Sequence, residues 1–325
     1  MNLRKIFFIK KDNHKIVISF FNIKIAIKNK YSRIDVLKKL LFMLPSKFKL
    51  LCLSFLDSEY RWKYEIQYKK FTYDEIFELF KTQKIYPKNI LSVSETIDYL
   101  INTKCSLARM GDGEEFLCNM LAETCAYPEL KQRLLEICAE GSNDSCLVCI
   151  NNFNADNELC PKEYRQHFVH YYSMVVPAQR LQKIKFSETN IYGDAYALAF
   201  YLHTDDKEIF YERRHKIETL WQNRKVLFVV NNFSDVLKDD VVFKDVLEKG
   251  YIYVPSSNAY EKYDEVMREI TENYDASWLI YVEAGAMATV LCYELSKQGY
   301  QALDMGSYYN RAYVHLPKKF FPNAD

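Results

Sequence analysis

The sequence predicts an α/β fold in which a mostly parallel β-sheet is flanked by helices and preceded by a small basic extension. Three observations predict it. Short apolar runs recur through the last hundred residues, and helix-length segments separate them. The first fifty residues carry 13 Lys and Arg against 2 Asp and Glu. With 49% hydrophobic residues and only 8 Gly and 8 Pro, the chain does not belong to the disordered or collagen-like classes.

The basic extension, residues 1–89, is predicted to begin with a small β-hairpin. Residues 5–9 and 16–28 have the apolar content and partial alternation of strands. Asp12 and Asn13 supply a turn between the two runs. A basic β-hairpin is therefore the expected start of the chain.

Two lysine-rich helices are predicted to follow the hairpin, at residues 34–44 and 48–56. Two interpretations of these helices stay open. In the first, their basic faces bind an anionic membrane surface. In the second, the helices pack onto the main domain and leave their lysines in solvent. No recognised DNA- or RNA-binding motif accompanies the charge, so nucleic acid is not an expected partner.

The sequence favours a cytoplasmic protein, either free or peripheral on the inner face of the cytoplasmic membrane. Lys10, Lys11 and Lys15 interrupt the apolar run that a signal peptide would need, and no stretch of 18 uncharged apolar residues appears. Nine scattered cysteines fit a reducing compartment. Cys146 and Cys149 fall in a strand-like run, where they are expected to point to opposite faces as core residues.

The main domain, residues 90–325, is predicted to begin with a helix, a strand and a second helix. A Ser-x-x-Glu capping box at residues 92–95 starts the first helix. An apolar strand at residues 105–110 ends abruptly in a Gly-Asp-Gly turn at residues 111–113. Residues 114–122 then show the pattern of a helix.

The rest of the main domain alternates strands with helices. A strand at residues 145–151 precedes a helical middle section at residues 161–223, which contains a strand near residues 190–192. Four buried strands follow, with one helix-length segment between neighbours, at residues 226–230, 251–254, 278–282 and 301–303. Asn258 is expected to cap the second of these helices, and Gly299 to end the third. The alternation predicts a Rossmann-like parallel sheet with right-handed crossovers.

The turn after the first strand carries the residues best suited to chemistry. Gly111 and Gly113 let the backbone approach a ligand, and Asp112 and Glu114 are expected to bring two carboxylates to one side of the turn. Such oxygen ligands suit Mg²⁺ or Mn²⁺. Arg109 adds a cation for a phosphate or for orienting a carboxylate. The alternative is an ordinary acidic turn in which Glu114 stabilises the helix dipole.

Residues 106–114, Ser-Leu-Ala-Arg-Met-Gly-Asp-Gly-Glu, resemble the signature of the GT-D glycosyltransferases. In these bacterial enzymes an Asp-x-Glu motif binds the metal of a nucleotide-sugar donor. Residues 254–265 are similar to the strand-loop-helix element of that family, and residues 288–306 to its closing helix and strand. The resemblance implies a GT-D type of sheet. It also implies a catalytic metal site built from Asp112, Glu114 and Arg109.

Further donor-binding candidates lie at or beside predicted strand ends, where ligands bind in parallel α/β sheets. The donor-binding set is Gly111, Gly113, Asn231, Asn258, Gly285 and Asp304. Asn231 and Asp304 also suit local turn bonding, and Asn258 also suits a helix cap. Glu283, at another strand end, is a candidate base for an acceptor hydroxyl.

These features predict a metal-dependent glycosyltransferase that moves a hexose from a nucleotide-diphosphate sugar to a hydroxyl of a bacterial surface glycan or glycoconjugate. A UDP-sugar is the favoured donor, and the acceptor is a capsule or lipopolysaccharide glycan or a lipid-linked saccharide. One alternative is a non-catalytic nucleotide-sugar-binding or scaffold protein. It draws on departures from the family pattern, such as Asn231 at a usually glycine-rich turn and Ser307 in place of a histidine. The other alternative, a metal-dependent phosphohydrolase, lacks further Asp and His ligands at recognisable spacing.

Overall fold

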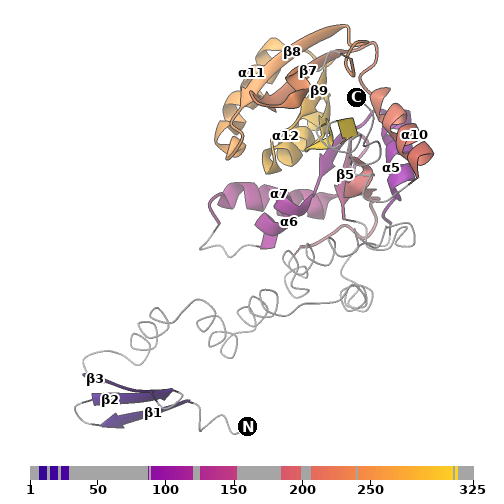
Figure 1. The fold of residues 1–325 in the computed structure, drawn as a ribbon. Coiled ribbons are helices and arrows are strands. Elements are labelled where there is room, and N and C mark those ends of the chain that lie inside the picture. Colours follow the sequence, from indigo (N-terminus) through magenta and orange to yellow (C-terminus); the bar gives the residue numbers. More distant parts are fainter. Residues whose placement is uncertain are drawn as a thin grey trace. The chain divides into compact units, whose positions relative to one another are not determined.

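The computed structural model describes residues 7–12, 15–20, 23–28, 87, 89–119, 125–151, 184–198, 206–238, 241–309 and 312–313 (Figure 1). The chain divides into two compact units, Met1–Lys70 and Phe71–Asp325. The helices predicted at residues 34–44 and 48–56 lie outside the described residues. So does the part of the predicted helical section at residues 161–183.

The amino-terminal unit contains a three-stranded antiparallel sheet, formed by β1 (Phe7–Asp12), β2 (Lys15–Phe20) and β3 (Ile23–Lys28). The predicted hairpin is therefore one strand short, because residues 16–28 contribute two strands. The register pairs Ile16 with Ile27 and Ile18 with Ile25. Apolar positions thus coincide across the ladder, which specifies the pairing of the two strands.

The carboxy-terminal unit is built on a seven-stranded sheet in which every pairing is parallel, as predicted. The strand order is β6-β5-β4-β10-β9-β7-β8. The strands are β4 (Ser106–Arg109), β5 (Cys146–Ile150), β6 (Gly193–Asp194), β7 (Lys225–Asn231), β8 (Glu248–Val254), β9 (Leu279–Val282) and β10 (Gln301–Asp304). The central strands are buried on both faces, which explains their continuous apolar runs.

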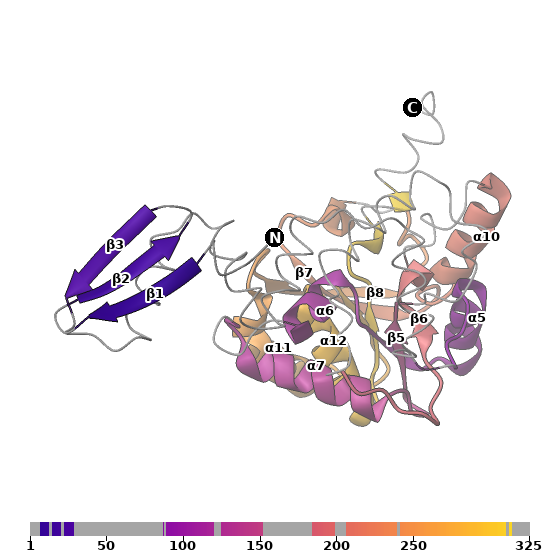
Figure 2. The same cartoon turned by 90° about the horizontal axis from the view of Figure 1, so that it is seen from below.

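Helices cover both faces of this sheet (Figures 1 and 2). The first face carries α6 (Asp112–Asn119), α7 (Pro128–Glu140), α11 (Tyr263–Asn273) and α12 (Ala286–Lys297). The second face carries α5 (Val93–Thr103), the 3₁₀ helix η3 (Ala195–Leu198) and α10 (Lys207–Glu218). Cys146 packs in the core of the first face and Cys149 in that of the second. This confirms that the two thiols point to opposite sides.

Local signals in the sequence account for several helix boundaries. The predicted capping box is present: the Ser92 hydroxyl accepts a hydrogen bond from the Glu95 N–H at 3.3 Å, and the Glu95 carboxylate accepts one from the Ser92 N–H at 2.8 Å. Asp206 caps α10 through its carboxylate. Gly299, with φ of +87°, follows the end of α12 as predicted.

Several further predicted elements differ from the structure. In the predicted helical section at residues 161–223, the described residues 184–194 form no helix. The described part of residues 232–247 contains turns and the 3₁₀ helix η5 (Asp235–Lys238), with no α-helix between β7 and β8. Helix α6 begins at Asp112, two residues before the predicted start.

Asn258 does not cap a helix through its side chain. It has φ of +58° and bends the chain into the 3₁₀ helix η6 (Ala259–Lys262), which precedes α11. Asparagine tolerates this left-handed conformation better than most residues. Its contribution to the local fold is therefore a backbone turn.

The connections leave the sheet toward opposite faces at two places. After β4 the chain enters α6 on the first face, whereas after β10 it packs Tyr308 and Tyr309 on the second face. After β9 the chain enters α12 on the first face, whereas after the neighbouring β7 it packs Val236 of η5 on the second. Such topological switch points are where open α/β sheets bind ligands, at the carboxyl ends of the strands.

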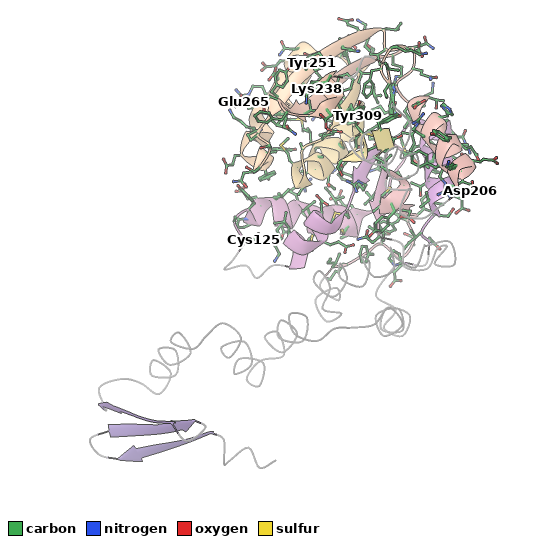
Figure 3. The ribbon with its side chains drawn as sticks, viewed as in Figure 1. Cys125, Asp206, Lys238, Tyr251, Glu265 and Tyr309 are labelled. Carbon is green, nitrogen blue, oxygen red and sulfur yellow. The ribbon has the colours of Figure 1, made fainter. Side chains whose placement is uncertain are left out.

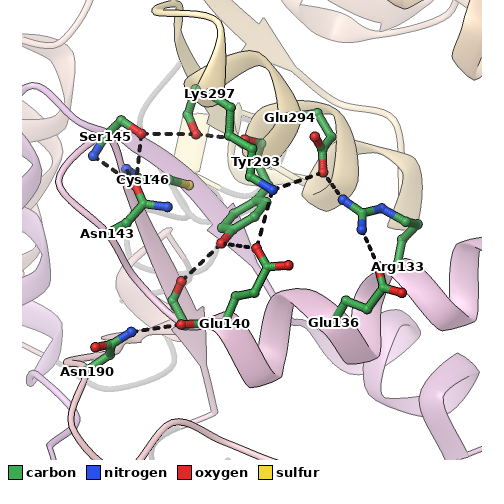
Figure 4. A network of polar contacts seen from close by, with 12 residues as sticks. Arg133, Glu136, Glu140, Asn143, Ser145, Cys146, Asn190, Tyr293, Glu294 and Lys297 are labelled. Atoms are coloured by element: carbon green, nitrogen blue, oxygen red, sulfur yellow. Dashed lines mark hydrogen bonds and ion pairs between the residues drawn. The ribbon is translucent and has the colours of Figure 1, made fainter.

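A polar network at the opposite, amino-terminal edge fastens α7 to α12 (Figure 4). The Tyr293 hydroxyl donates to the Glu140 carboxylate at 2.8 Å, and the Lys297 ammonium lies 3.3 Å from the same carboxylate. Arg133 contacts Glu294 across the two helices. These contacts hold the two helices that cover β4, β5 and β10 on the first face. In the part of the chain that the structure describes, no helix has the length and apolar character needed to cross a membrane.

Candidate functional site

The β4/β10 switch point collects four of the predicted site residues. Arg109 ends β4, Gly111 and Glu114 follow it, and Asp304 ends the neighbouring β10. Because parallel strands place their carboxyl ends at one edge, segments almost a whole domain apart in sequence meet here. The structure thus brings the predicted turn together with the closing strand.

Arg109 lies against two glycines. Its Nη2 is 3.9 Å from Oδ1 of Asp304. Gly306 has φ of +54°, and a Cβ at this position would overlap Nη2 of Arg109. At Gly111, a Cβ would lie 3.4 Å from Nη1 of Arg109. The absence of two side chains therefore makes room for the guanidinium.

The Glu114 carboxylate folds back over the turn. Its Oε2 would lie only 2.8 Å from a Cβ on Gly111, and the Glu114 side chain is buried. The side chains of Arg109 and Glu114 thus both border Gly111. Gly113 differs, since a Cβ there would meet no atom within 4 Å and the residue is exposed. The turn is therefore crowded by neighbouring side chains at its first glycine, and the approach of a ligand to either glycine stays a prediction.

Asp304 is enclosed between β10, β4 and α12, with 2% of its surface exposed. The Thr289 hydroxyl lies 3.1 Å from Oδ2 of Asp304 and 2.9 Å from the Arg109 carbonyl oxygen, so its single proton is shared between two acceptors. Burial raises the pKa of the Asp304 carboxyl, while the Arg109 guanidinium and the Thr289 hydroxyl oppose that rise. The Asp304 carboxyl group therefore lies close enough to the Arg109 guanidinium to orient it.

The predicted metal ligands occupy the first turn of α6. Asp112 is the first residue of that helix, and its side chain lies outside the described residues. The described side chains do not gather three or more His, Cys, Asp or Glu into one potential metal cluster. Mg²⁺ and Mn²⁺ need no such cluster, because one or two carboxylates normally suffice beside water and phosphate oxygens. The buried carboxylate of Glu114, at a helix amino terminus facing the switch point, fits such a ligand.

A buried hydrogen-bonded pair beside this site, Asn151 and Glu115, was not predicted from the sequence. The Asn151 side-chain amide, just after β5, donates to Oε1 of Glu115 at 2.6 Å. Both residues are at most 3% exposed. The pair ties the start of α6 to the end of β5. A second acid next to Glu114 was the available clue, together with the polar residue that ends the β5 run.

The β9/β7 switch point holds a second carboxylate. Ser234 Oγ donates to Oε2 of Glu283 at 2.8 Å, and the Tyr281 hydroxyl donates to Oε1 at 3.1 Å. Burial raises the pKa of Glu283 to about 7, although both hydrogen bonds favour the ionised form. A group with this pKa can accept and release a proton near neutral pH.

The remaining donor-binding candidates are spread along the same edge. Asn231 ends β7, and its side-chain oxygen accepts the Phe233 N–H at 2.9 Å in a local turn. Asn258 follows β8, an edge strand of the sheet, and is exposed. Gly285 opens α12 with φ of +53°, and a Cβ there would meet no atom within 4 Å. Of these three residues, only Gly285 follows a strand that pairs with β10, namely β9.

Comparison with known proteins gives a consistent family match. A family model described as glycosyltransferase GT-D fold matches residues 107–314. The probable glycosyl transferase Gly of Streptococcus gordonii is 28% identical over 227 residues, which cover 67% of this chain and 32% of the relative. Glycosyltransferase GlyD of Streptococcus pneumoniae serotype 4 is 28% identical over 229 residues, covering 67% of this chain and 26% of the relative. The chain thus spans between a quarter and a third of the length of these relatives.

Two solved structures share the fold. One, described as a new glycosyltransferase (DUF1792) from Streptococcus sanguinis, is 28% identical with a TM-score of 0.59, covering 68% of this chain and 81% of that chain. Another, described as the highly conserved domain of unknown function 1792 with a distinct glycosyltransferase fold, has a TM-score of 0.62 at 24% identity. It covers 72% of this chain and 82% of that chain. The predicted fold class is confirmed by this likeness and by the parallel sheet.

Proposed function

This chain belongs to the GT-D glycosyltransferase family, and from that premise we propose that it transfers a sugar from a nucleotide-diphosphate donor to a hydroxyl of an acceptor glycan. The observation that carries the proposal is the placement of Arg109, Gly111 and Glu114 at the β4/β10 switch point. The switch point supports the proposal, because ligands bind at such positions in open α/β sheets.

The diphosphate of the donor is proposed to bind at the start of α6. Asp112 and Glu114 hold Mn²⁺ or Mg²⁺ there, and Arg109 supports them with its guanidinium. When bound, the metal neutralises negative charge on the diphosphate leaving group. Arg109 adds a fixed positive charge to the same end of the donor, because Asp304 and the two glycines hold its guanidinium in place.

The rest of the donor is proposed to extend along the sheet edge toward α12. The backbone at Gly111 and Gly113 lies at the amino terminus of α6, and Gly285 lies at that of α12. Both helix starts present N–H groups and positive dipole ends, which favour phosphate and ribose oxygens. Asn231, Asn258 and Asp304 complete the proposed donor set, with Asp304 acting through Arg109.

We further propose a UDP-hexose as donor and a bacterial surface glycan or lipid-linked saccharide as acceptor, as in capsule or lipopolysaccharide assembly. The basic amino-terminal extension supports this proposal, because 13 Lys and Arg in fifty residues suit an anionic membrane surface. The enzyme would then work in the cytoplasm, peripheral to the inner face of the membrane.

A donor panel tests the proposal. The full chain is incubated with UDP-glucose, UDP-galactose, the two UDP-N-acetylhexosamines and GDP-mannose, with Mn²⁺ or with chelator, and nucleotide release is measured. Metal-dependent release with at least one donor is expected, and Asp112→Asn should lose it. A non-catalytic binding protein would instead bind a donor without releasing nucleotide. Absence of both binding and release for every donor would overturn the proposal.

A further inference from the structure

The β9/β7 switch point lies on the same edge of the sheet as the proposed donor site. In the strand order β4-β10-β9-β7, one strand separates β4 from β9. At about 4.8 Å per strand, Glu283 therefore follows a strand roughly 10 Å from the one that ends in Arg109. The pleat places Glu283 on the face of Tyr281 and Arg109 on the face of Leu107, and both of these neighbours pack in the second-face core. The two side chains thus share one side of the sheet edge.

The Glu283 carboxylate is held by two neutral hydroxyls. Ser234 comes from the loop after β7, and Tyr281 comes from β9 itself. Among the residues that the structure describes, no Lys or Arg forms an ion pair with Glu283. Two hydroxyl donors fix the orientation of a carboxylate without the strong charge stabilisation that a guanidinium would supply. The arrangement suits a carboxylate that must take up a proton.

We propose that Glu283 is the general base that deprotonates the acceptor hydroxyl. The inference rests on the proposed transferase function. In the step, the carboxylate of Glu283 takes the hydroxyl proton as the acceptor oxygen forms a bond to C1 of the donor sugar. The bond between C1 and the phosphate oxygen breaks, and its electron pair leaves with the nucleotide diphosphate. Glu283 then gives the proton to solvent.

The electrostatic setting agrees with this role. Burial raises the pKa of Glu283 to about 7, and the neighbouring Asp235 of η5 also raises it, whereas Ser234 and Tyr281 lower it. These are the groups that act on Glu283 from η5, the β7 loop and β9. Because the base works as carboxylate, the transfer rate should rise as the pH increases through about 7.

The test compares the Glu283→Gln variant with the unaltered protein, both as full chains. Glutamine keeps nearly the same shape but offers one oxygen, so one of the two hydroxyls retains its acceptor and the other meets the amide NH₂ group. The matched control is Glu265→Gln in the first turn of α11, an exposed carboxylate on a helix that packs on the first face of the sheet, whereas Glu283 lies toward the second face (Figure 3). Nucleotide release is followed with the productive donor and Mn²⁺, using water and a mixture of p-nitrophenyl glycosides as acceptors. We expect Glu283→Gln to slow release by about 100-fold or more, and Glu265→Gln to leave it unchanged.

Sodium azide separates a base from a merely structural residue. Azide carries no proton that must be removed, so it can attack C1 without a base. Azide should restore nucleotide release in Glu283→Gln and yield a glycosyl azide, detected by mass spectrometry. Slow release without azide rescue would overturn the proposal, as would an unchanged rate in Glu283→Gln. If the unaltered chain turns over no donor, the proposed function fails first, whereas loss confined to the variant concerns Glu283 alone.

Discussion

The guanidinium of Arg109 lies 3.9 Å from the carboxylate of Asp304. This contact joins β4 and β10, which are neighbours in the seven-stranded sheet although they are its first and last strands in sequence. Thr289 of α12 adds a third contact, since its hydroxyl reaches both the Asp304 carboxylate and the Arg109 carbonyl. A cation at the proposed donor site is thus fixed by a buried acid from another part of the chain. Its orientation depends on β10 and α12 as much as on its own strand.

Gly306→Ala should disable the site by displacing Arg109. A Cβ at Gly306 would overlap the guanidinium, and the positive φ adds a strain of about 1–2 kcal/mol. We expect a lower free energy of unfolding and a larger loss of nucleotide release. The matched control is Gly299→Ala, where φ is +87° but a Cβ would meet no atom within 4 Å. Equal losses of activity in the two variants would show that backbone strain alone, and not Arg109, is responsible.

Asp304→Asn should change the pH dependence of stability. Burial raises the pKa of Asp304 above its unfolded value, so the folded state holds the proton more tightly than the unfolded state. This contribution to stability is complete below the unfolded pKa and is lost as the pH rises through the folded pKa. Asp304→Asn should remove that decline, as measured by denaturant unfolding across the acidic range. A decline of the same size in both proteins would contradict the assignment to Asp304.

Much of the fold follows from local patterns in the sequence. The strands β7, β9 and β10 were predicted because strands buried on both faces have continuous apolar runs, and α5 because Ser92 and Glu95 form a capping box. The two-residue strand β6, Gly193–Asp194, has no such run and is defined by pairing with β5. Its position was therefore displaced in the prediction.

The site was less predictable than the fold, because its key contacts are distant in sequence. The turn at Gly111 stands out locally, but the Thr289 hydroxyl and the Arg109 carbonyl are 180 positions apart. Nothing near Gly306 in the sequence indicates that an arginine side chain fills the space above it. Such contacts depend on which strands become neighbours, and that order is fixed only when the whole sheet forms.

Tyr293→Phe should destabilise the fold without affecting the chemistry. It removes the hydrogen bond from the Tyr293 hydroxyl to Glu140 in the network between α7 and α12 (Figure 4). A single hydrogen bond of this kind contributes about 0.5–1.5 kcal/mol, so the free energy of unfolding should fall by that amount. Nucleotide release should be unchanged at a temperature where both proteins are folded. A selective loss of release would show that this edge of the sheet influences the proposed site.

Glu114→Gln should weaken metal activation if its buried carboxylate is a metal ligand. A neutral amide oxygen binds Mn²⁺ less strongly than a carboxylate, so the Mn²⁺ concentration for half-maximal nucleotide release should rise by about 10-fold or more. Glu208→Gln is the matched control, because Glu208 also lies in the first turn of a helix, α10, on the second face. The control tests the loss of a first-turn acid as such, which changes helix stability by about 0.3–1 kcal/mol. The assignment would be contradicted by an unaltered Mn²⁺ requirement in Glu114→Gln together with reduced stability in both variants. Glu114 would then only stabilise the helix dipole, and other residues would bind the metal.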